Sequence, residues 1–263
     1  MRNTDFIALE KAISTSRLST YKNHSPSNNQ DKLIQNYVFN AKISENFYFL
    51  LQNLEVTLRN AIYDSYCNAG FSRDFFYIRE QNTTRPYNRE YHSYACWKMI
   101  GTVKYHLVRD GSVVTDGKVI SELNFGFWTT LLEENHYKTL IWRRVFKQVF
   151  PHYPHGRSTD DDVDRVSQKV NSIRQLRNRI FHYEPIFNRP YLKQDRDDIL
   201  EIIGWISPEM KKLSQIYDEF DFLIHEKKRI AKLLVEMKGR SNRLSKKGKK
   251  FKKKLISTQR RGN

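Results

Sequence analysis

A repeat of apolar side chains from about Asp31 to Cys67 constrains the fold of this chain more than any other feature. The apolar residues recur mainly every three or four positions, which places them on one face of an α-helix. The repeat predicts one long helix, with a break near Ser44 as an open alternative. Gly70 is its expected C-terminal cap, because glycine readily adopts a left-handed conformation. The apolar face consists of Leu33, Tyr37, Ala41, Phe47, Leu50, Leu51, Leu54, Leu58, Ala61 and Ile62.

Most of the remaining chain also has helical periodicity, without βαβ alternation or an internal repeat. Val113 and Val114 lie between two turn signals. They form either a short strand or the approach to a helix that Thr115 or Asp116 caps. The sequence therefore predicts an all-α fold. Besides the long helix, the expected helical segments are Phe6–Ser16, Tyr91–Val108, Lys118–Leu132, Tyr137–Phe150, Asp161–Tyr183, Gln194–Trp205 and Pro208–Met237.

The positive charge of the chain is concentrated at its C-terminal end. The 263 residues carry a net charge of +17, and from Lys238 onward there are 12 basic and no acidic residues. The preceding part has 34 basic and 29 acidic residues, and the chain as a whole is 39% hydrophobic, enough for a folded core. We therefore expect a folded domain over residues 1–238 and a flexible polybasic tail over residues 239–263.

The polybasic tail is expected to bind RNA, because clustered lysines release counterions from a polyanion. A solvated tail that only aids solubility is one alternative. An anionic membrane is another, disfavoured because no strong apolar helical face accompanies the basic run. The expected RNA-binding residues of the tail are Lys246, Lys247, Lys249, Lys250, Lys252, Lys253 and Lys254.

Other features narrow the expected location and cofactors. Cys67 and Cys96 are the only cysteines, too few for a disulfide framework, so a reducing cytoplasm is expected. The first residues lack the apolar run of a signal peptide, and no stretch approaches the ~20 apolar residues of a membrane span. Since no phosphate-binding loop appears, and His152 and His155 are better explained as loop residues than as zinc ligands, no cofactor or metal is expected.

The residues with the most specific chemistry are Arg177, Asn178 and His182, near the end of the helix predicted over Asp161–Tyr183. Asn178 and His182 are four residues apart and share a helical face, and Arg177 is long enough to bend toward it. They offer a phosphate-binding cation, a hydrogen-bond donor and a proton carrier, as metal-free phosphodiester cleavage requires. The expected buried stripe of this helix is Val163, Val166, Val170, Ile173, Leu176, Ile180 and Phe181.

Each of these candidates has a structural alternative. Arg177 and its neighbours would also suit a helix C-terminus that ends before Pro185 and packs against a neighbouring carboxylate. Arg174, four residues before Asn178, is a candidate second cation for RNA. The aromatic residues Phe125, Phe127 and Trp128 are suited to stacking bases, but their apolar neighbours at helical spacing favour core packing.

Four blocks of the sequence, spread over about residues 30 to 206, resemble one family when they are taken in order. They are Leu54–Ile62, Ser121–Trp128, Leu176–Ile186 and Ile203–Ile206. Together they resemble the Abi (abortive-infection) proteins of bacteria, of the AbiD/AbiF-like type, within the HEPN superfamily. The Arg-x4-His spacing alone is a weak signal, and its combination with the other three blocks carries the resemblance.

The resemblance implies a HEPN-like helical bundle with additional helices, and a metal-independent endoribonuclease of an antiphage or toxin–antitoxin system. Arg177 would bind the scissile phosphate, His182 would transfer a proton or orient the phosphate, and Asn178 would orient the pair. Arg59-Asn60 begins a second copy of the signature, but Asp64 stands where its histidine would be. A homodimer would therefore be required to complete the site.

Two further expectations accompany the resemblance. Some members are paired with a structured noncoding RNA, a partner that the polybasic tail would suit. The alternative function is a non-catalytic RNA-binding or phage-sensing module. It would use the basic groove that Arg177, Asn178 and His182 are expected to border, at the edge of the buried stripe where a partner helix would pack.

Overall fold

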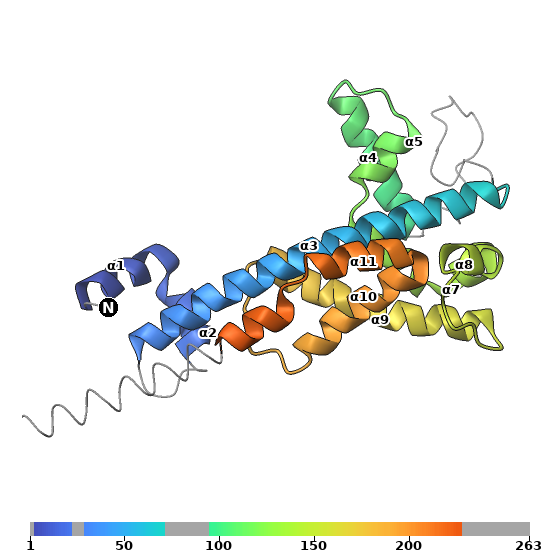
Figure 1. Ribbon diagram of the computed structural model, residues 1–263. Coiled ribbons are helices and arrows are strands. Elements are labelled where there is room, and N and C mark those ends of the chain that lie inside the picture. Colours follow the sequence, from blue (N-terminus) through green and yellow to red (C-terminus); the bar gives the residue numbers. More distant parts are fainter. Residues whose placement is uncertain (1–2, 23–28, 72–94, 228–263) are drawn as a thin grey trace, which may run out of the picture. The chain divides into compact units, whose positions relative to one another are not determined.

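The computed structural model describes residues 3–22, 29–71 and 95–227, and every element in these ranges is helical (Figure 1). The chain divides into two compact units, Met1–Asp218 and Glu219–Asn263. The first unit contains the elements from α1 to α11. In the second unit, residues 220–227 are helical. The predicted all-α fold is therefore confirmed, and the proposed tail over residues 239–263 lies outside the described residues.

The first unit is built along one long helix, α3, which spans Gln30–Asn68 without a break at Ser44 (Figure 1). The Asn29 side chain caps its first turn by accepting a hydrogen bond from the Asp31 amide at 3.2 Å. At the other end Gly70 has φ +73°, the left-handed conformation expected of a helix-terminating glycine. Helix α3 contacts α2, α6, α8, α9, α10 and α11.

Helix α9, which carries the predicted motif, spans Thr159–Phe181 and packs against α6 (Phe125–Glu133) and α10 (Leu192–Ile206). Its predicted stripe is buried from Val163 to Ile180. Phe181 is the exception, because 40% of its surface is exposed. The prediction that Phe181 belongs to the core is therefore wrong, since it follows the last buried position at the end of the helix.

Two short helices precede α3. Helix α1 spans Asn3–Ile13 and α2 spans Thr15–Lys22, with Ser14 at φ +87° between them. They form a small core of their own with the start of α3 and with the chain that follows α9. Its buried members are Leu18, Tyr21, Leu33 and Phe187.

The region between α3 and α9 differs from the prediction in its helix breaks. Helix α4 spans Ala95–Arg109, and Val113 and Val114 form no strand. The Thr115 hydroxyl accepts from the Lys118 amide at 3.3 Å and caps α5 (Asp116–Glu122), which confirms the capping alternative. The single predicted helix Lys118–Leu132 is wrong, because the Asn124 side chain accepts from the Phe127 amide and starts α6 anew.

Two more predicted helices are interrupted. The segment Tyr137–Phe150 consists of α7 (Asn135–Tyr137), a π-helical turn η3 (Lys138–Trp142) and α8 (Arg143–Val149). Helix α11 (Pro208–Ile216) ends before residues 217–219, so the single helix Pro208–Met237 is wrong. Residues 228–237 of that prediction lie outside the described ranges.

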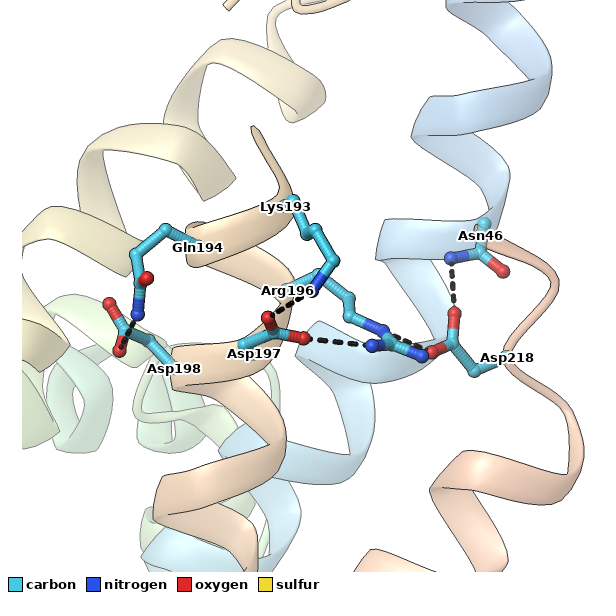
Figure 2. Close-up of polar contacts among 7 residues, drawn as sticks. All are labelled: Asn46, Lys193, Gln194, Arg196, Asp197, Asp198 and Asp218. Atoms are coloured by element: carbon cyan, nitrogen blue, oxygen red, sulfur yellow. Dashed lines mark hydrogen bonds and ion pairs between the residues drawn. The ribbon is translucent and has the colours of Figure 1, made fainter. Parts of the chain in front are cut away.

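The chain leaves the helical path after α11 at a residue whose side chain is held inside the first unit. The carboxylate of Asp218 is fully buried and accepts hydrogen bonds from Asn46 of α3, at 2.9 Å, and from Arg196 of α10 (Figure 2). Arg196 also pairs with Asp197, which in turn pairs with Lys193. This network of one amide and four charged side chains joins α3 and α10 to the last residue of the first unit.

Within the described ranges, no helix combines the length and the apolar content of a membrane-spanning segment.

Candidate functional site

The C-terminal end of α9 has the hydrogen bonds of a Schellman cap. The Glu184 amide donates to the Arg179 carbonyl at 2.8 Å, and the Tyr183 amide donates to the Ile180 carbonyl at 3.0 Å. This cap places Tyr183 at φ +57°, a left-handed conformation that glycine usually supplies. The helix therefore ends at Phe181, two residues before the predicted end, and His182 is its exposed capping residue.

Arg177 lies on the side of α9 that faces Phe181. Its guanidinium carbon is 4.0 Å from the centre of the Phe181 ring, a cation–π contact between residues one helical turn apart. Its Nε atom is buried and has no hydrogen-bond partner among the residues that the structure describes. Because buried guanidinium donors are nearly always paired, this atom is an exception among the buried polar groups of the described residues.

Arg177 acts electrostatically on the carboxylate of Glu55 in α3. Burial raises the pKa of Glu55, while Arg177, Arg59 and a hydrogen bond from the Phe125 amide act in the opposite direction. The Arg59 Nε atom donates to the Asn60 side chain at 3.3 Å. The block that begins an incomplete second signature thus contributes a second arginine charge that acts on Glu55.

The three predicted catalytic residues lie at the C-terminal end and in the cap of α9, but no contact joins their side chains in the described part of the chain. Asn178 and His182 keep the four-residue spacing of one helical face, and the His182 amide donates to the Asn178 carbonyl at 2.9 Å. Arg177 is directed over Phe181 instead. One chain therefore presents the imidazole and the cation as neighbours, without a preformed pair.

The other predicted site residues have varied surroundings. Both Nε and an Nη of Arg174 donate to the Asn171 side chain, at 3.0 and 2.6 Å, so part of its donor capacity is already used. The tail lysines lie outside the described residues. Phe125, Phe127 and Trp128 are at most 2% exposed, which confirms core packing. The ring of His155 packs against two aromatic side chains, and the described residues contain no cluster of three or more metal-binding side chains.

A buried asparagine of α3 holds the chain that follows the motif. The Asn40 side-chain oxygen accepts hydrogen bonds from the Ile186 amide, at 2.7 Å, and from the Phe187 amide, at 3.1 Å. Arg179 adds a hydrogen bond to the Pro185 carbonyl at 3.0 Å. Asn40 escaped the sequence analysis, although a polar residue between apolar positions of a helical face is a signal that could have found it.

A groove of about 550 Å³ opens beside the cap of α9, between that cap, α2 and α3. Aromatic side chains dominate its lining, and the Tyr48 and Phe181 rings are stacked with their centres 5.4 Å apart. The sequence indicates a groove at the edge of the α9 stripe but not this lining, because the walls come from segments more than 130 residues apart in sequence. Its lining consists of Arg17, Tyr21, Tyr37, Asn40, Ala41, Ser44, Glu45, Tyr48, Ile180, Phe181 and Tyr183.

Comparisons with models of protein families, with curated proteins and with solved structures found no match to this chain. The resemblance to Abi proteins therefore stays a prediction that rests on the four sequence blocks.

Proposed function

We propose that this protein is a metal-independent endoribonuclease, of the abortive-infection or toxin type, whose active site forms between two copies of the chain. The observation that carries the proposal is the arrangement at the end of α9. A half-buried arginine with an unpaired Nε lies little more than one helical turn before an exposed imidazole. These are a phosphate-binding group and a proton-transfer group on one short, capped segment.

The proposed reaction uses the ribose 2′-hydroxyl as the nucleophile and therefore restricts the substrate to RNA. The 2′-oxygen bonds to phosphorus as it loses its proton, and the bond from phosphorus to the 5′-oxygen breaks. The leaving 5′-oxygen takes up a proton, so that the products are a 2′,3′-cyclic phosphate and a 5′-hydroxyl. Arg177 would stabilise the charge on the phosphoryl oxygens, and His182 would transfer a proton, with Asn178 orienting the pair.

A second copy of the chain supplies what one copy lacks. The reaction removes one proton and delivers another, whereas each chain has one motif histidine. Asp64 occupies the corresponding place in the incomplete block that starts at Arg59. Because His182 is exposed at the end of its helix, a two-fold symmetric contact could bring two such residues together.

The proposal is tested by incubating purified protein with total RNA in the presence of EDTA. We expect cleavage by the wild-type protein and a loss of roughly 100-fold or more in the double variant Arg177→Ala, His182→Ala. A matched control is His106→Ala, Arg109→Ala, since these residues are the histidine and arginine of the last turn of α4. Equal cleavage by the motif variant and the control would reject the site.

The aromatic groove favours a second candidate function, a non-catalytic module that binds RNA. Its exposed rings and Arg17 are suited to an unpaired strand, and the polybasic tail would add affinity for a structured RNA partner. This alternative predicts salt-sensitive RNA binding without new RNA ends. New ends that depend on His182 would exclude it.

A further inference from the structure

We propose that the groove beside the cap of α9 binds an unpaired base of single-stranded RNA, stacked against the exposed rings of Tyr48 and Tyr183. The inference rests on the proposed function in taking RNA as the ligand. It assigns the groove a separate role, which is to hold a nucleotide next to the motif. Tyr48 is 52% exposed and Tyr183 is 74% exposed, so both rings are accessible to a base.

The size and rigidity of the groove suit such a ligand. Its volume of about 550 Å³ lies within the usual range of roughly 300–1,000 Å³ for small-molecule sites. The buried Tyr21 ring fixes its inner side, because it stacks on Phe187 at 5.2 Å and meets Tyr37 edge-on at 5.6 Å. The phenol of Tyr21 has its pKa raised to about 12 by burial, so it stays a neutral hydroxyl.

Tyr183 is held in a backbone conformation that costs free energy. Its φ of +57° is unfavourable for a bulky side chain, and glycine would fulfil the same role in the Schellman cap without that cost. Strained residues of this kind cluster at ligand sites, where the strain places a side chain usefully. The strain at Tyr183 places an exposed ring at the edge of the groove, with the Arg17 guanidinium 5.8 Å from its centre.

The two charged residues of the groove, Arg17 and Glu45, are suited to the phosphate and to the base of a nucleotide. Arg17 is a donor for phosphate, and it already lies over one of the proposed stacking rings. Glu45 is exposed and has no ion pair within the described part of the chain. A carboxylate accepts hydrogen bonds from the amino group of cytosine, whereas uracil presents a carbonyl oxygen in that place. We therefore expect the groove to prefer cytidine over uridine.

The test measures binding of fluorescent oligocytidine and oligouridine RNA to the full chain in the His182→Ala background, which prevents cleavage. We expect Tyr183→Gly and Tyr48→Ala each to weaken oligocytidine binding by roughly 5-fold to 150-fold, the effect of losing one base–aromatic stack. Tyr183→Phe keeps a ring and should bind as the parent does. Tyr105→Ala is the matched control, because Tyr105 of α4 is 65% exposed and does not line the groove.

Thermal unfolding of the same variants separates binding from stability. Tyr183→Gly relieves the left-handed strain, so it should raise Tm while it weakens binding, which loss of folding cannot explain. The salt dependence separates the groove from the tail. Arg17→Ala should make the plot of log K against log salt less steep by about one, the effect of losing one phosphate contact. Tyr48→Ala should leave this slope unchanged.

The outcomes distinguish this inference from the proposed catalysis. If Tyr183→Gly and Tyr48→Ala bind oligocytidine as the parent does, the inference is overturned, even if the wild-type protein cleaves RNA. Equal affinity for oligocytidine and oligouridine would overturn the role of Glu45. If the wild-type protein leaves RNA intact but binding depends on both rings, the endoribonuclease proposal fails and the groove assignment stands.

Discussion

Replacing Asn40 with alanine should destabilise the protein more than a typical buried hydrogen bond would. Asn40 is only 6% exposed. Its side-chain oxygen accepts hydrogen bonds from the backbone amides of Ile186 and Phe187, two residues that are themselves buried. Asn40→Ala leaves both amides without an acceptor. Each unsatisfied buried donor costs about 1–3 kcal/mol, so the expected loss for the two amides is about 2–6 kcal/mol. A total stability of about 5–15 kcal/mol is typical of a folded domain, so the effect would be large.

Asn53→Ala provides the matched control, because it removes another buried asparagine from the same helix. The Asn53 amide donates to the Ser214 hydroxyl at 3.1 Å, and that hydroxyl keeps its own bond to the Met210 carbonyl at 2.8 Å. No buried donor is therefore abandoned, and the expected loss is about 1 kcal/mol.

Urea unfolding of both variants, followed by circular dichroism, measures the two losses on one scale. The slope against urea should stay unchanged, since neither substitution alters the surface exposed on unfolding. These two hydrogen bonds of Asn40, here called the Asn40 clamp, also hold the chain that directly follows the cap of α9. If Asn40→Ala loses no more free energy than Asn53→Ala, the clamp has no special role and the reasoning is refuted.

The remaining predictions concern three other buried groups. Arg196→Met should cost about 3–5 kcal/mol in urea unfolding because it removes the guanidinium that pairs with the buried Asp218 carboxylate, and Asp218→Asn added to it should restore part of the loss. A loss below about 1 kcal/mol would contradict this. Burial raises the pKa of Cys96 to about 12, so a thiol reagent should modify Cys67 in the native protein and Cys96 only after unfolding; equal rates for both thiols would contradict it. Burial also raises the pKa of Glu55 in the folded state, so the stability that this residue contributes is present below its unfolded pKa and lost as pH rises through the folded pKa. The free energy of unfolding of Glu55→Gln, compared with that of the wild type in urea, should therefore be larger at about pH 7 than at about pH 4. A difference between variant and wild type that is the same at both pH values would contradict the assignment.

The elements that sequence predicts well are those with a strong local period. Helix α3 carries an apolar repeat over its whole length and a glycine after its end, and both features act within the helix itself. The buried stripe of α9 is predicted for the same reason. These helices form where their periodicity indicates, since each buries its apolar face against several others.

The helix breaks are predicted poorly because they depend on polar side chains that compete with a good helical period. Asn124 has apolar neighbours on both sides, yet its side chain caps α6 and ends the helix before it. Asp218 interrupts a second predicted helix because its carboxylate is held by Asn46 and Arg196, which are distant in sequence. Periodicity is a local property, and neither contact can be read from it.

In the candidate site too, the features that depend on local spacing are predicted and those that depend on distant contacts are not. The shared face of Asn178 and His182 follows from their spacing, and the half-buried position of Arg177 follows from its place beside the stripe. The lining of the groove does not follow, because Tyr48 and Tyr183 are brought to one groove only by the tertiary structure. The left-handed conformation of Tyr183 has no signal either, since a tyrosine normally argues against such a backbone.

The chemistry of the RNA ends tests the central claim most directly. A defined RNA would be incubated with the protein in EDTA, and its new ends would be identified, with a second substrate that lacks the 2′-hydroxyl at the cleaved position. The account predicts 2′,3′-cyclic phosphate and 5′-hydroxyl ends, none from the 2′-deoxy substrate and none from His182→Ala. Ends that carry a 3′-hydroxyl and a 5′-phosphate, or cleavage that persists without His182 or the 2′-hydroxyl, would contradict it.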